Sequence, residues 1–253
     1  MKKKISIFIC VFGVLLISCL FIVLSKYRLN QTFTYEIDKE KGEVTITAYL
    51  GDAKKNEARK CNYTKCVKVP EKIDGYPVTT IGKRAFQWGK AETIILPESI
   101  TTIEEDAFFG CKNLQTIEGI ENVETIGDRA FSMCYFLEEW DISNVKELGE
   151  GAFSQCNTIR KVQIPEGVNV IKGSLCYGMG SLSEVSLPES VTTLESRAFG
   201  NCPSLKAIYL SPNVKEIWEG AFANIEDQLT IYGERGSYAE EYAKQAGIKF
   251  VAK

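Results

Sequence analysis

The sequence contains no histidine. Without an imidazole, the chain can hold neither a Ser-His-Asp nor a Cys-His catalytic arrangement, and it can hold no histidine-bearing zinc site. It also lacks the commonest general base of enzymes. Most familiar classes of hydrolase are therefore excluded.

Basic residues are scarce in most of the chain. The net charge of the 253 residues is −3, but residues 1–28 carry five bases and no acid, so that 25 bases and 33 acids follow them. This body, with a net charge of −8, repels phosphate backbones and offers little counterion release. We therefore expect no nucleic-acid partner. A hydrophobic content of 45% is enough for a globular core.

The amino terminus has the pattern of a membrane anchor. Residues 5–24 contain no charged side chain, and a helix of this length spans roughly 30 Å, the thickness of a bilayer core. Three lysines precede the segment, and Lys26 and Arg28 follow it. This distribution predicts a single-pass protein of the cell membrane with a cytoplasmic amino terminus and an extracytoplasmic body.

Two alternatives to the anchor stay open. Leu16–Cys19 resembles a bacterial lipobox, in which Cys19 is lipidated after cleavage, and an ordinary cleaved signal peptide is the other alternative. The apolar residues 20–24 argue against lipidation, because a polar tether usually follows a lipidated cysteine. An uncleaved anchor is the preferred interpretation.

The body consists of one motif repeated seven times at intervals of 22 or 23 residues. An aliphatic residue stands five positions before the phenylalanine of each motif, and another stands eight positions before it. The motif centres are Ala85–Phe86, Ala107–Phe108, Ala130–Phe131, Ala152–Phe153, Leu175–Cys176, Ala198–Phe199 and Ala221–Phe222. Short segments with alternating apolar residues, such as Leu182–Pro188, lie between the motifs and predict parallel strands.

A unit of this size cannot bury a core alone, so neighbouring coils must stack and share one. The period predicts a mainly β, leucine-rich-repeat solenoid of about seven repeats. Residues 32–37 and 43–50 predict a β-hairpin that caps its start, and Ser237 is expected to cap a helix that ends at Gly247 before a last strand at 248–251. The expected units are an anchor at 1–28, a β cap at 29–66, the solenoid at 67–228 and an α/β cap at 229–253.

The repeat pattern L-x-x-I-x-L-P followed by V-x-x-I-x-x-x-A-F-x-x-C resembles the BspA-like leucine-rich repeats of bacterial and protozoan surface proteins. The resemblance covers about Val67 to Tyr232, and it extends to the opening segment Ile73–Val78 and the closing segment Tyr232–Phe250. Leu175–Cys176 in place of Ala-Phe is a local departure. The resemblance implies adhesion or host-protein binding at a cell surface, as in some members of that family.

The cysteines fall into two groups. Cys111, Cys134, Cys156 and Cys202 each follow the repeat phenylalanine position by three residues, which predicts a row of buried structural thiols, as also expected for Cys176. A row does not converge on one point, so we expect no metal site. Cys61 and Cys66 lie outside the repeat register, and either a disulfide between them or two free thiols fits their spacing.

The sequence predicts no enzyme and no cofactor. Ser143 and Lys146 match the Ser-x-x-Lys pattern of acyl enzymes, but Val145 between them belongs to a repeat column and no second motif accompanies the match. The pattern is therefore interpreted as part of the repeat.

The strand residues that point away from the core form two rows. The rows are Thr93, Thr116, Glu139, Lys161, Glu184 and Ala207, and Ile95, Glu118, Asp141, Gln163, Ser186 and Tyr209. From them we select a candidate binding face of Thr116, Glu118, Glu139, Asp141, Lys161, Gln163, Glu184, Ser186 and Tyr209. Solenoids use such faces to bind macromolecules.

The predicted function is binding or adhesion at the cell surface, with an unidentified protein or glycan as the partner and residues 5–24 in the membrane. The alternative is a structural spacer of the cell envelope without its own ligand. The sequence specifies no oligomeric state.

Overall fold

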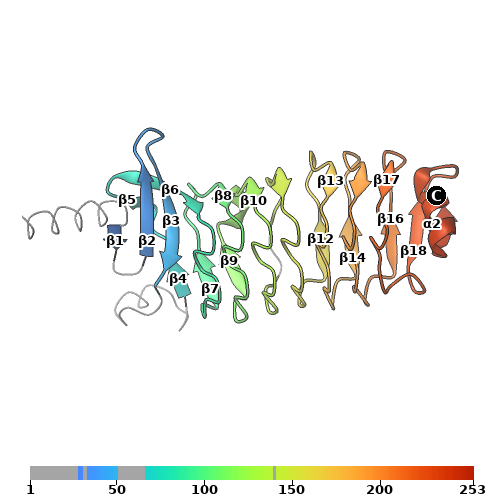
Figure 1. The fold of residues 1–253 in the computed structure, drawn as a ribbon, viewed down its shortest axis with the longest axis horizontal. Coiled ribbons are helices and arrows are strands. Elements are labelled where there is room, and N and C mark those ends of the chain that lie inside the picture. Colours follow the sequence, from blue (N-terminus) through green and yellow to red (C-terminus); the bar gives the residue numbers. More distant parts are fainter. Residues whose placement is uncertain (1–27, 31–32, 51–65, 139–140) are drawn as a thin grey trace, which may run out of the picture.

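The computed structural model describes residues 28–30, 33–50, 66–138 and 141–253. In these residues the chain forms an elongated solenoid whose coils stack along the long axis of Figure 1, between a hairpin at one end and helix α2 (Tyr238–Ala246) at the other. The solenoid makes about eight turns. This is one more than the seven motifs, because β18 (Thr230–Gly233) follows the last motif and pairs with β16 (Ala207–Tyr209) as another coil.

The first ladder of strands carries the predicted outward rows. Its strands are β4 (Cys66–Lys68), β7 (Thr93–Ile95), β9 (Thr116–Glu118), β12 (Lys161–Gln163), β14 (Glu184–Ser186), β16, β18 and β19 (Lys249–Ala252). The hydrogen-bonded strands of this ladder form three groups: β4, β7 and β9; β12 and β14; and β16, β18 and β19. All pairs within the groups are parallel, and those between repeats join equivalent positions, as Lys161 with Glu184 shows. This arrangement confirms the predicted register.

A second ladder lies on the adjoining side of the coils. Each repeat contributes to it one short strand, which ends five residues before the phenylalanine position. Its strands are β3 (Glu43–Tyr49), β6 (Tyr76–Ile81), β8 (Thr102–Ile103), β10 (Thr125–Ile126), β11 (Glu147–Leu148), β13 (Val170–Ile171), β15 (Thr193–Leu194) and β17 (Glu216–Ile217). These pairs are also parallel. A short 3-10 turn, Ile120–Asn122, follows β9.

The conserved spacing of the motif places its apolar residues in one continuous core. All seven pairs at the Ala-Phe position are buried, including the Leu-Cys pair of the fifth repeat. The aliphatic residues five and eight positions before the phenylalanine position are buried as well. The rings stack from coil to coil: Phe108 lies 5.0 Å from Phe86 and 5.1 Å from Phe131, measured between ring centroids. Cys176 interrupts this column, which continues with Phe199 and Phe222 at 5.9 Å.

Two tight turns flank the phenylalanine position in every repeat. The residues two before and two after it all have φ between 51° and 73°, whatever their side chain. They are Arg84, Asp106, Arg129, Gly151, Ser174, Arg197 and Gly220, and Trp88, Gly110, Met133, Gln155, Gly178, Asn201 and Asn224. Backbone bonds such as Phe108 N–H to Ala130 O, at 2.8 Å, join these turns between coils, so that they extend the ladders around the coil.

The amino-terminal hairpin has the predicted form. β2 (Phe33–Asp38) and β3 are antiparallel, and Gly42, with φ of 73°, closes the turn between them. β1 (Arg28–Asn30) pairs with the outer edge of β2, β3 continues into the second ladder beside β6, and β5 (Lys72–Ile73) pairs antiparallel with β6. The hairpin therefore covers the first edge of that ladder.

The carboxyl-terminal cap also follows the prediction, except for one hydrogen bond. Helix α2 ends at Gly247, which has φ of 70°, and β19 pairs with β18. Ser237 occupies the N-cap position, but its hydroxyl forms no capping bond, and its buried Oγ has no hydrogen-bond partner among the described residues. Backbone N–H groups of Glu240 and Glu241 donate to the Ser237 carbonyl instead.

The predicted membrane segment, residues 5–24, and the possible lipidation site Cys19 lie outside the described residues. Among the residues that are described, no helix combines the length and apolar character needed to cross a bilayer.

Candidate binding surfaces

The outward rows of the first ladder form the surface that we call the sheet face. Of the predicted face residues, Thr116, Glu118, Asp141, Lys161, Gln163, Glu184, Ser186 and Tyr209 are exposed. Glu139 lies outside the described residues. Thr93, expected in the same outward row, is buried at 6% exposure, between its register partners Cys66 and Thr116.

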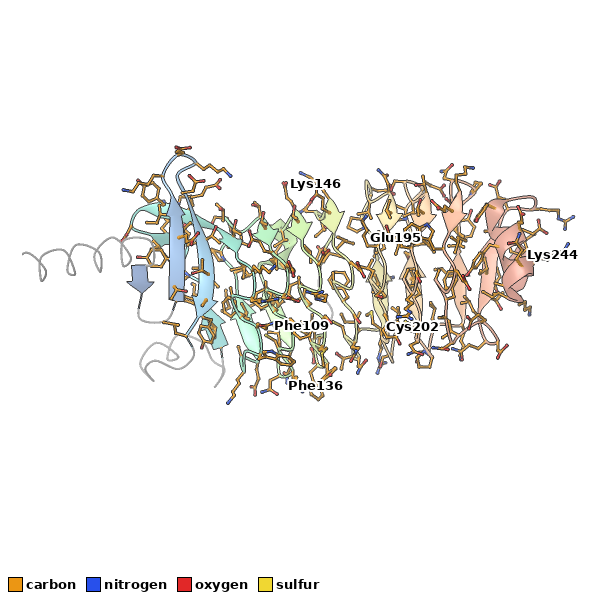
Figure 2. The ribbon with its side chains drawn as sticks, viewed as in Figure 1. Phe109, Phe136, Lys146, Glu195, Cys202 and Lys244 are labelled. Carbon is orange, nitrogen blue, oxygen red and sulfur yellow. The ribbon has the colours of Figure 1, made fainter. Side chains whose placement is uncertain are left out.

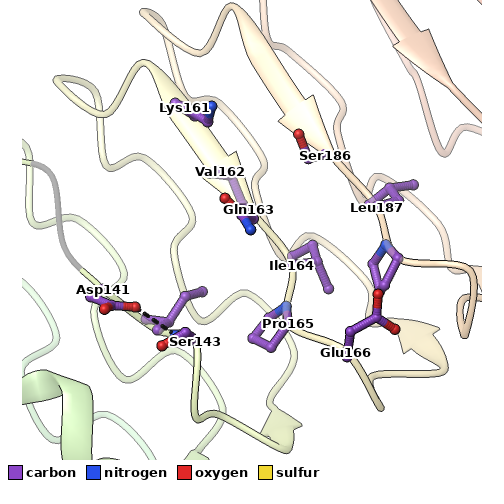
Figure 3. Close-up of a pocket in the computed structure, with 12 residues that line it drawn as sticks. Asp141, Ser143, Lys161, Val162, Gln163, Ile164, Pro165, Glu166, Ser186 and Leu187 are labelled. Atoms are coloured by element: carbon purple, nitrogen blue, oxygen red, sulfur yellow. Dashed lines mark hydrogen bonds between the residues drawn. The ribbon is translucent and has the colours of Figure 1, made fainter.

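The sheet face contains a hollow of about 640 Å³ where three coils meet. Figure 3 shows Asp141 and Ser143 on one side of it, β12 with Lys161 and Gln163 in the middle, and Ser186 with Leu187 on the other side. Four of the predicted face residues line this hollow. Its remaining lining comes from Ile142, Val162, Ile164, Pro165, Glu166 and Pro188.

Acidic groups dominate the electrostatics of this face. The Ser143 N–H donates to Asp141 Oδ1 at 2.8 Å, and this bond, together with one from the Ser143 side chain, lowers the pKa of Asp141. Lys161 Nζ lies 2.7 Å from Glu184 Oε1, so the basic side chain that lines the hollow already forms an ion pair with an acidic one. Glu118 adds a further exposed carboxylate. The face therefore presents acidic side chains suited to basic groups.

Tyr209 lies near the end of the sheet face. It is 39% exposed, and it is in register with Tyr232 of β18. Lys253 Nζ lies 4.4 Å from the centroid of the Tyr232 ring, so the carboxyl-terminal residue packs over that neighbour. Tyr209 thus combines an accessible ring with a position beside the cap.

The repeat cysteines are structural, as predicted. Cys134 Sγ donates to the Phe108 carbonyl at 3.2 Å, and Cys111, Cys156 and Cys202 make the equivalent bond to the preceding coil. Burial raises the pKa of Cys156 to about 12 and that of Cys202 to about 11. Figure 2 places Cys202 inside the body of the solenoid. The four thiols thus hydrogen-bond each of these coils to the preceding one.

The other candidate groups do not come together as a catalytic site. Lys146 Nζ pairs with Glu124 Oε2 at 2.9 Å, whereas Ser143 lines the hollow of the sheet face. Val145 between them is buried in its repeat column. Cys66 begins β4, and Cys61 lies outside the described residues, so a bond between the two stays a prediction.

A second surface was missed by reasoning that considered strands alone. It consists of the residues one, two and four positions after the phenylalanine position, and we call it the turn face. At its amino-terminal end, Trp88 is half-exposed and contacts Phe109, with ring centroids 5.1 Å apart. Lys112 Nζ lies 5.7 Å from the Trp88 ring and 5.8 Å from the Tyr135 ring. Phe136, next to Tyr135, lies at the outer edge of the solenoid in Figure 2.

Towards the carboxyl terminus the turn face has its own hollow, of about 540 Å³. Its lining is Gln155, Asn157, Tyr177, Gly178, Gly180, Asn201, Pro203 and Asn224, and none of these residues lines the hollow of the sheet face. The sequence contains a signal for this surface, because the residues one, two and four positions after each repeat phenylalanine can be aligned in the same way as the strand residues.

The fold defines a leucine-rich-repeat solenoid protein. Its coils stack along two parallel ladders, they share one core of aliphatic and phenylalanine side chains, and both ends are capped. The family described as BspA type leucine rich repeat region matches residues 79–206 and 170–234, with six copies. The chain belongs to this family. No curated protein matches it by sequence.

Solved structures of bacterial repeat proteins are similar to this chain. A leucine-rich cell surface protein of Faecalibacterium prausnitzii has 27% identity over 82% of this chain and 54% of its own, with a TM-score of 0.71. A leucine-rich repeat protein of Bacteroides ovatus has 30% identity over 82% of this chain and 55% of its own, with a TM-score of 0.67. The chain therefore spans about half the length of these two proteins. The leucine-rich repeat protein of T. pallidum, at 23% identity and a TM-score of 0.63 over 89% of this chain and 98% of its own, shares the fold.

Proposed function

We propose that this chain is a cell-surface binding module that holds a protein partner on its sheet face. The observation that carries the proposal is the hollow between Asp141 and Ser186, where predicted outward residues from neighbouring coils surround one space. Membership of the BspA-type family supports a surface role, as does the similarity to a bacterial cell surface protein. Residues 5–24 are proposed as the anchor to the cell membrane.

The chemistry of the sheet face indicates a partner with basic side chains. Glu118, Asp141 and Glu184 are exposed, while Lys161 is already engaged by Glu184. Complementary charge steers association and fixes register more than it adds affinity. This surface fits a partner segment that is rich in lysine or arginine and whose apolar side chains reach Ile164 and Leu187 in the hollow.

The test is a comparison of charge reversals on and off the sheet face. Full-length protein in detergent is titrated with a lysine-rich peptide and with each partner recovered by cross-linking, for the parent and for Glu118→Lys and Tyr209→Ser. Glu147→Lys, on β11 of the second ladder, is the matched control, because Glu147 is an equally exposed strand residue away from the sheet face.

We expect Glu118→Lys to weaken binding roughly three- to tenfold and to reduce its salt dependence, with an unchanged melting temperature. Tyr209→Ser should weaken binding of a recovered partner, because exposed tyrosines are frequent hot spots. Glu147→Lys should bind as the parent does. If both face variants bind every partner as the parent does, the sheet face is not the binding surface, and the spacer function takes its place.

A further inference from the structure

The hollow of the turn face is lined by four carboxamides, a phenol, two glycines and a proline, and no charged side chain lines it. Asn224 Nδ2 donates to Asn201 Oδ1 at 3.0 Å, and Asn201 Nδ2 donates to Tyr177 Oη at 2.8 Å, so three successive coils are joined by a polar ladder. An ion placed here would lose water without gaining a counter-charge. The hollow therefore suits an uncharged ligand.

Much of the hydrogen-bonding capacity in this hollow is unused. A carboxamide offers two N–H donors and an acceptor oxygen. The Gln155 carboxamide makes no hydrogen bond with any described residue. The Asn157 carboxamide accepts a single long one among them, from the Gly180 N–H at 3.4 Å. Hydroxyl groups, which both donate and accept, match such a set of side chains.

Gln155 also stands at a position that disfavours its side chain. Its φ is 61°, a left-handed conformation that glycine and asparagine adopt at lower cost. Gly178 and Asn201 hold the equivalent positions of the next two repeats. Trp88 and Met133 share this conformation in other repeats, so the backbone tolerates glutamine here without favouring it, and the carboxamide is left available to a ligand.

The aromatic end of the turn face supplies a platform. A Cβ atom at Gly110 would lie 2.3 Å from the Trp88 ring, which shows that the indole packs directly on the Gly110 backbone. Phe109 holds the ring from the side, yet 50% of Trp88 stays exposed. Lys112 Nζ lies 5.7 Å from the centroid of this ring. An amphipathic ring fixed in this way can stack its exposed part against the C–H face of a sugar.

Acidic residues are depleted along the whole turn face. Its three positions in seven repeats contain a single acid, Glu226 of the last repeat, in a chain with 33 acids. The face joins aromatic rings at one end to carboxamides at the other. This composition differs sharply from that of the acidic sheet face.

We propose that the turn face is a second binding site, which takes a neutral polyhydroxylated chain: an uncharged oligosaccharide or polysaccharide that runs along the solenoid axis. Its hydroxyls bond to Gln155, Asn157 and Asn201, and a sugar ring stacks on Trp88. Neighbouring coils are separated by roughly 4.8 Å, which is similar to the length of one sugar in an extended chain, so that successive sugars meet successive coils. A peptide is disfavoured, because the hollow offers no deep apolar pocket for an anchoring side chain.

The test uses the full chain in a detergent without a sugar headgroup. Cellohexaose, xylohexaose and the hexamer of N-acetylglucosamine are titrated by calorimetry, with polygalacturonate and a neutral hexapeptide as contrasting probes. We expect at least one neutral hexamer to bind, with an affinity that changes little between about 0.1 and 0.5 M salt, because the ligand carries no charge.

Two variants assign that binding to the turn face. Gln155→Gly and Asn157→Ala should each weaken it roughly fivefold, as expected for the loss of hydrogen bonds. Gln155→Gly should keep or raise the melting temperature, since glycine relieves the left-handed backbone. Glu118→Lys on the sheet face should leave sugar binding unchanged, which separates this site from the proposed protein-binding face.

Three results would overturn the proposal. The first is an absence of binding by all three neutral hexamers. The second is binding that Gln155→Gly and Asn157→Ala leave unaltered. The third is a preference for polygalacturonate or the hexapeptide over every neutral sugar.

Discussion

Phe131 shows how much of the stability of each coil depends on one side chain. Its ring is fully buried, and it stacks on Phe108 at 5.1 Å and on Phe153 at 6.3 Å. A ring in this position fills the space between three coils at once. The phenylalanine column is thus a packing unit that runs through the solenoid rather than a set of separate contacts.

We expect Phe131→Ala to lower the free energy of unfolding by roughly 3 to 5 kcal/mol, because it removes a large side chain from a core that cannot fully collapse. Glu118→Ala, at an exposed strand position, should change it by no more than about 0.5 kcal/mol. Urea denaturation of both variants measures this difference. Equal midpoints would contradict the assignment of inward and outward positions.

Asp106 is a buried carboxylate whose charge is balanced by two arginines. Its side chain is 4% exposed, and it accepts hydrogen bonds from Arg129 Nε at 2.9 Å and Arg84 Nε at 3.3 Å. The bond from Arg129 lowers the pKa of Asp106 below its ordinary value of 3.8, against the opposing effect of burial. The ionised form is therefore favoured in the folded state.

Asp106→Asn should destabilise the protein by about 1 to 3 kcal/mol at neutral pH, since charge-assisted hydrogen bonds are lost. Because the folded-state pKa lies below the unfolded one, the stabilisation is fully present above pH 3.8 and is lost as the pH falls through the folded-state pKa. The deficit of the variant should therefore shrink in acid, which thermal melts over a pH series will show. Glu105→Gln, which alters a more exposed partner of Arg129, is the control and should cost less. A deficit that does not change with pH would contradict this account.

At the scale of elements, the fifth repeat exchanges the sizes of two core residues. Leu175 stands where other repeats have alanine, and Cys176 stands where they have phenylalanine, yet both are fully buried. We infer that the larger leucine takes part of the space that the smaller cysteine leaves. The two positions therefore compensate for each other within one turn.

This compensation predicts strong non-additivity. Leu175→Ala alone should cost roughly 2 to 5 kcal/mol through the cavity that it leaves, and Cys176→Phe alone roughly 1 to 3 kcal/mol through overpacking. The double variant restores the motif of the other repeats and should be more stable than either single variant, by an interaction energy of roughly 1 to 3 kcal/mol. Unfolding of all four proteins in urea completes the cycle. Additive losses would show that the two side chains pack independently.

The regular columns explain which elements could be predicted. An aliphatic residue at a constant offset from Phe131 or Phe199 must face the same core, so spacing alone predicts the coils and the exposed strand positions. The two left-handed turns in each repeat were not predicted, because Trp88, Met133 and Gln155 are atypical of that conformation, and only the glycines and asparagines signal it. The amide hollow of the turn face lies at these turns and was missed for the same reason.

Two failures arose where the repeat meets its surroundings. Thr93 follows the outward pattern, yet it is buried between Cys66 of the first strand of the ladder and Thr116 of the next repeat. Ser237 has a side chain typical of an N-cap, but the Ser237 carbonyl bonds to the first turn of the helix while its hydroxyl stays unsatisfied among the described residues. Periodicity describes what a coil shares with its neighbours and carries no information on what is particular to the ends.

At the scale of the whole molecule, the two surfaces differ in chemistry but share one rigid frame. Backbone bonds at the turns join each repeat coil to the next, and parallel strand pairs join most of the coils as well, so the sheet face and the turn face cannot move independently within a coil. The caps close both ends: the hairpin covers β6, and Tyr242 of α2 packs on Phe222, with ring centroids 6.1 Å apart. A ligand that extends over several coils thus meets side chains already held at a constant spacing, which reduces the ordering cost of binding.

The orientation of this frame at the cell depends on residues 5–24, for which an anchor is the preferred expectation. If that segment spans the membrane, the full chain should stay in the membrane fraction after a carbonate wash, and protease added to intact spheroplasts should digest the body. Cys19→Ala provides the control for lipidation, because an anchor made by the apolar segment does not need that thiol. Loss of membrane retention in Cys19→Ala would favour the lipoprotein, and release of the body into the medium would exclude a stable anchor. Retention together with a protected body would place both binding surfaces inside the cell and contradict a role at its surface.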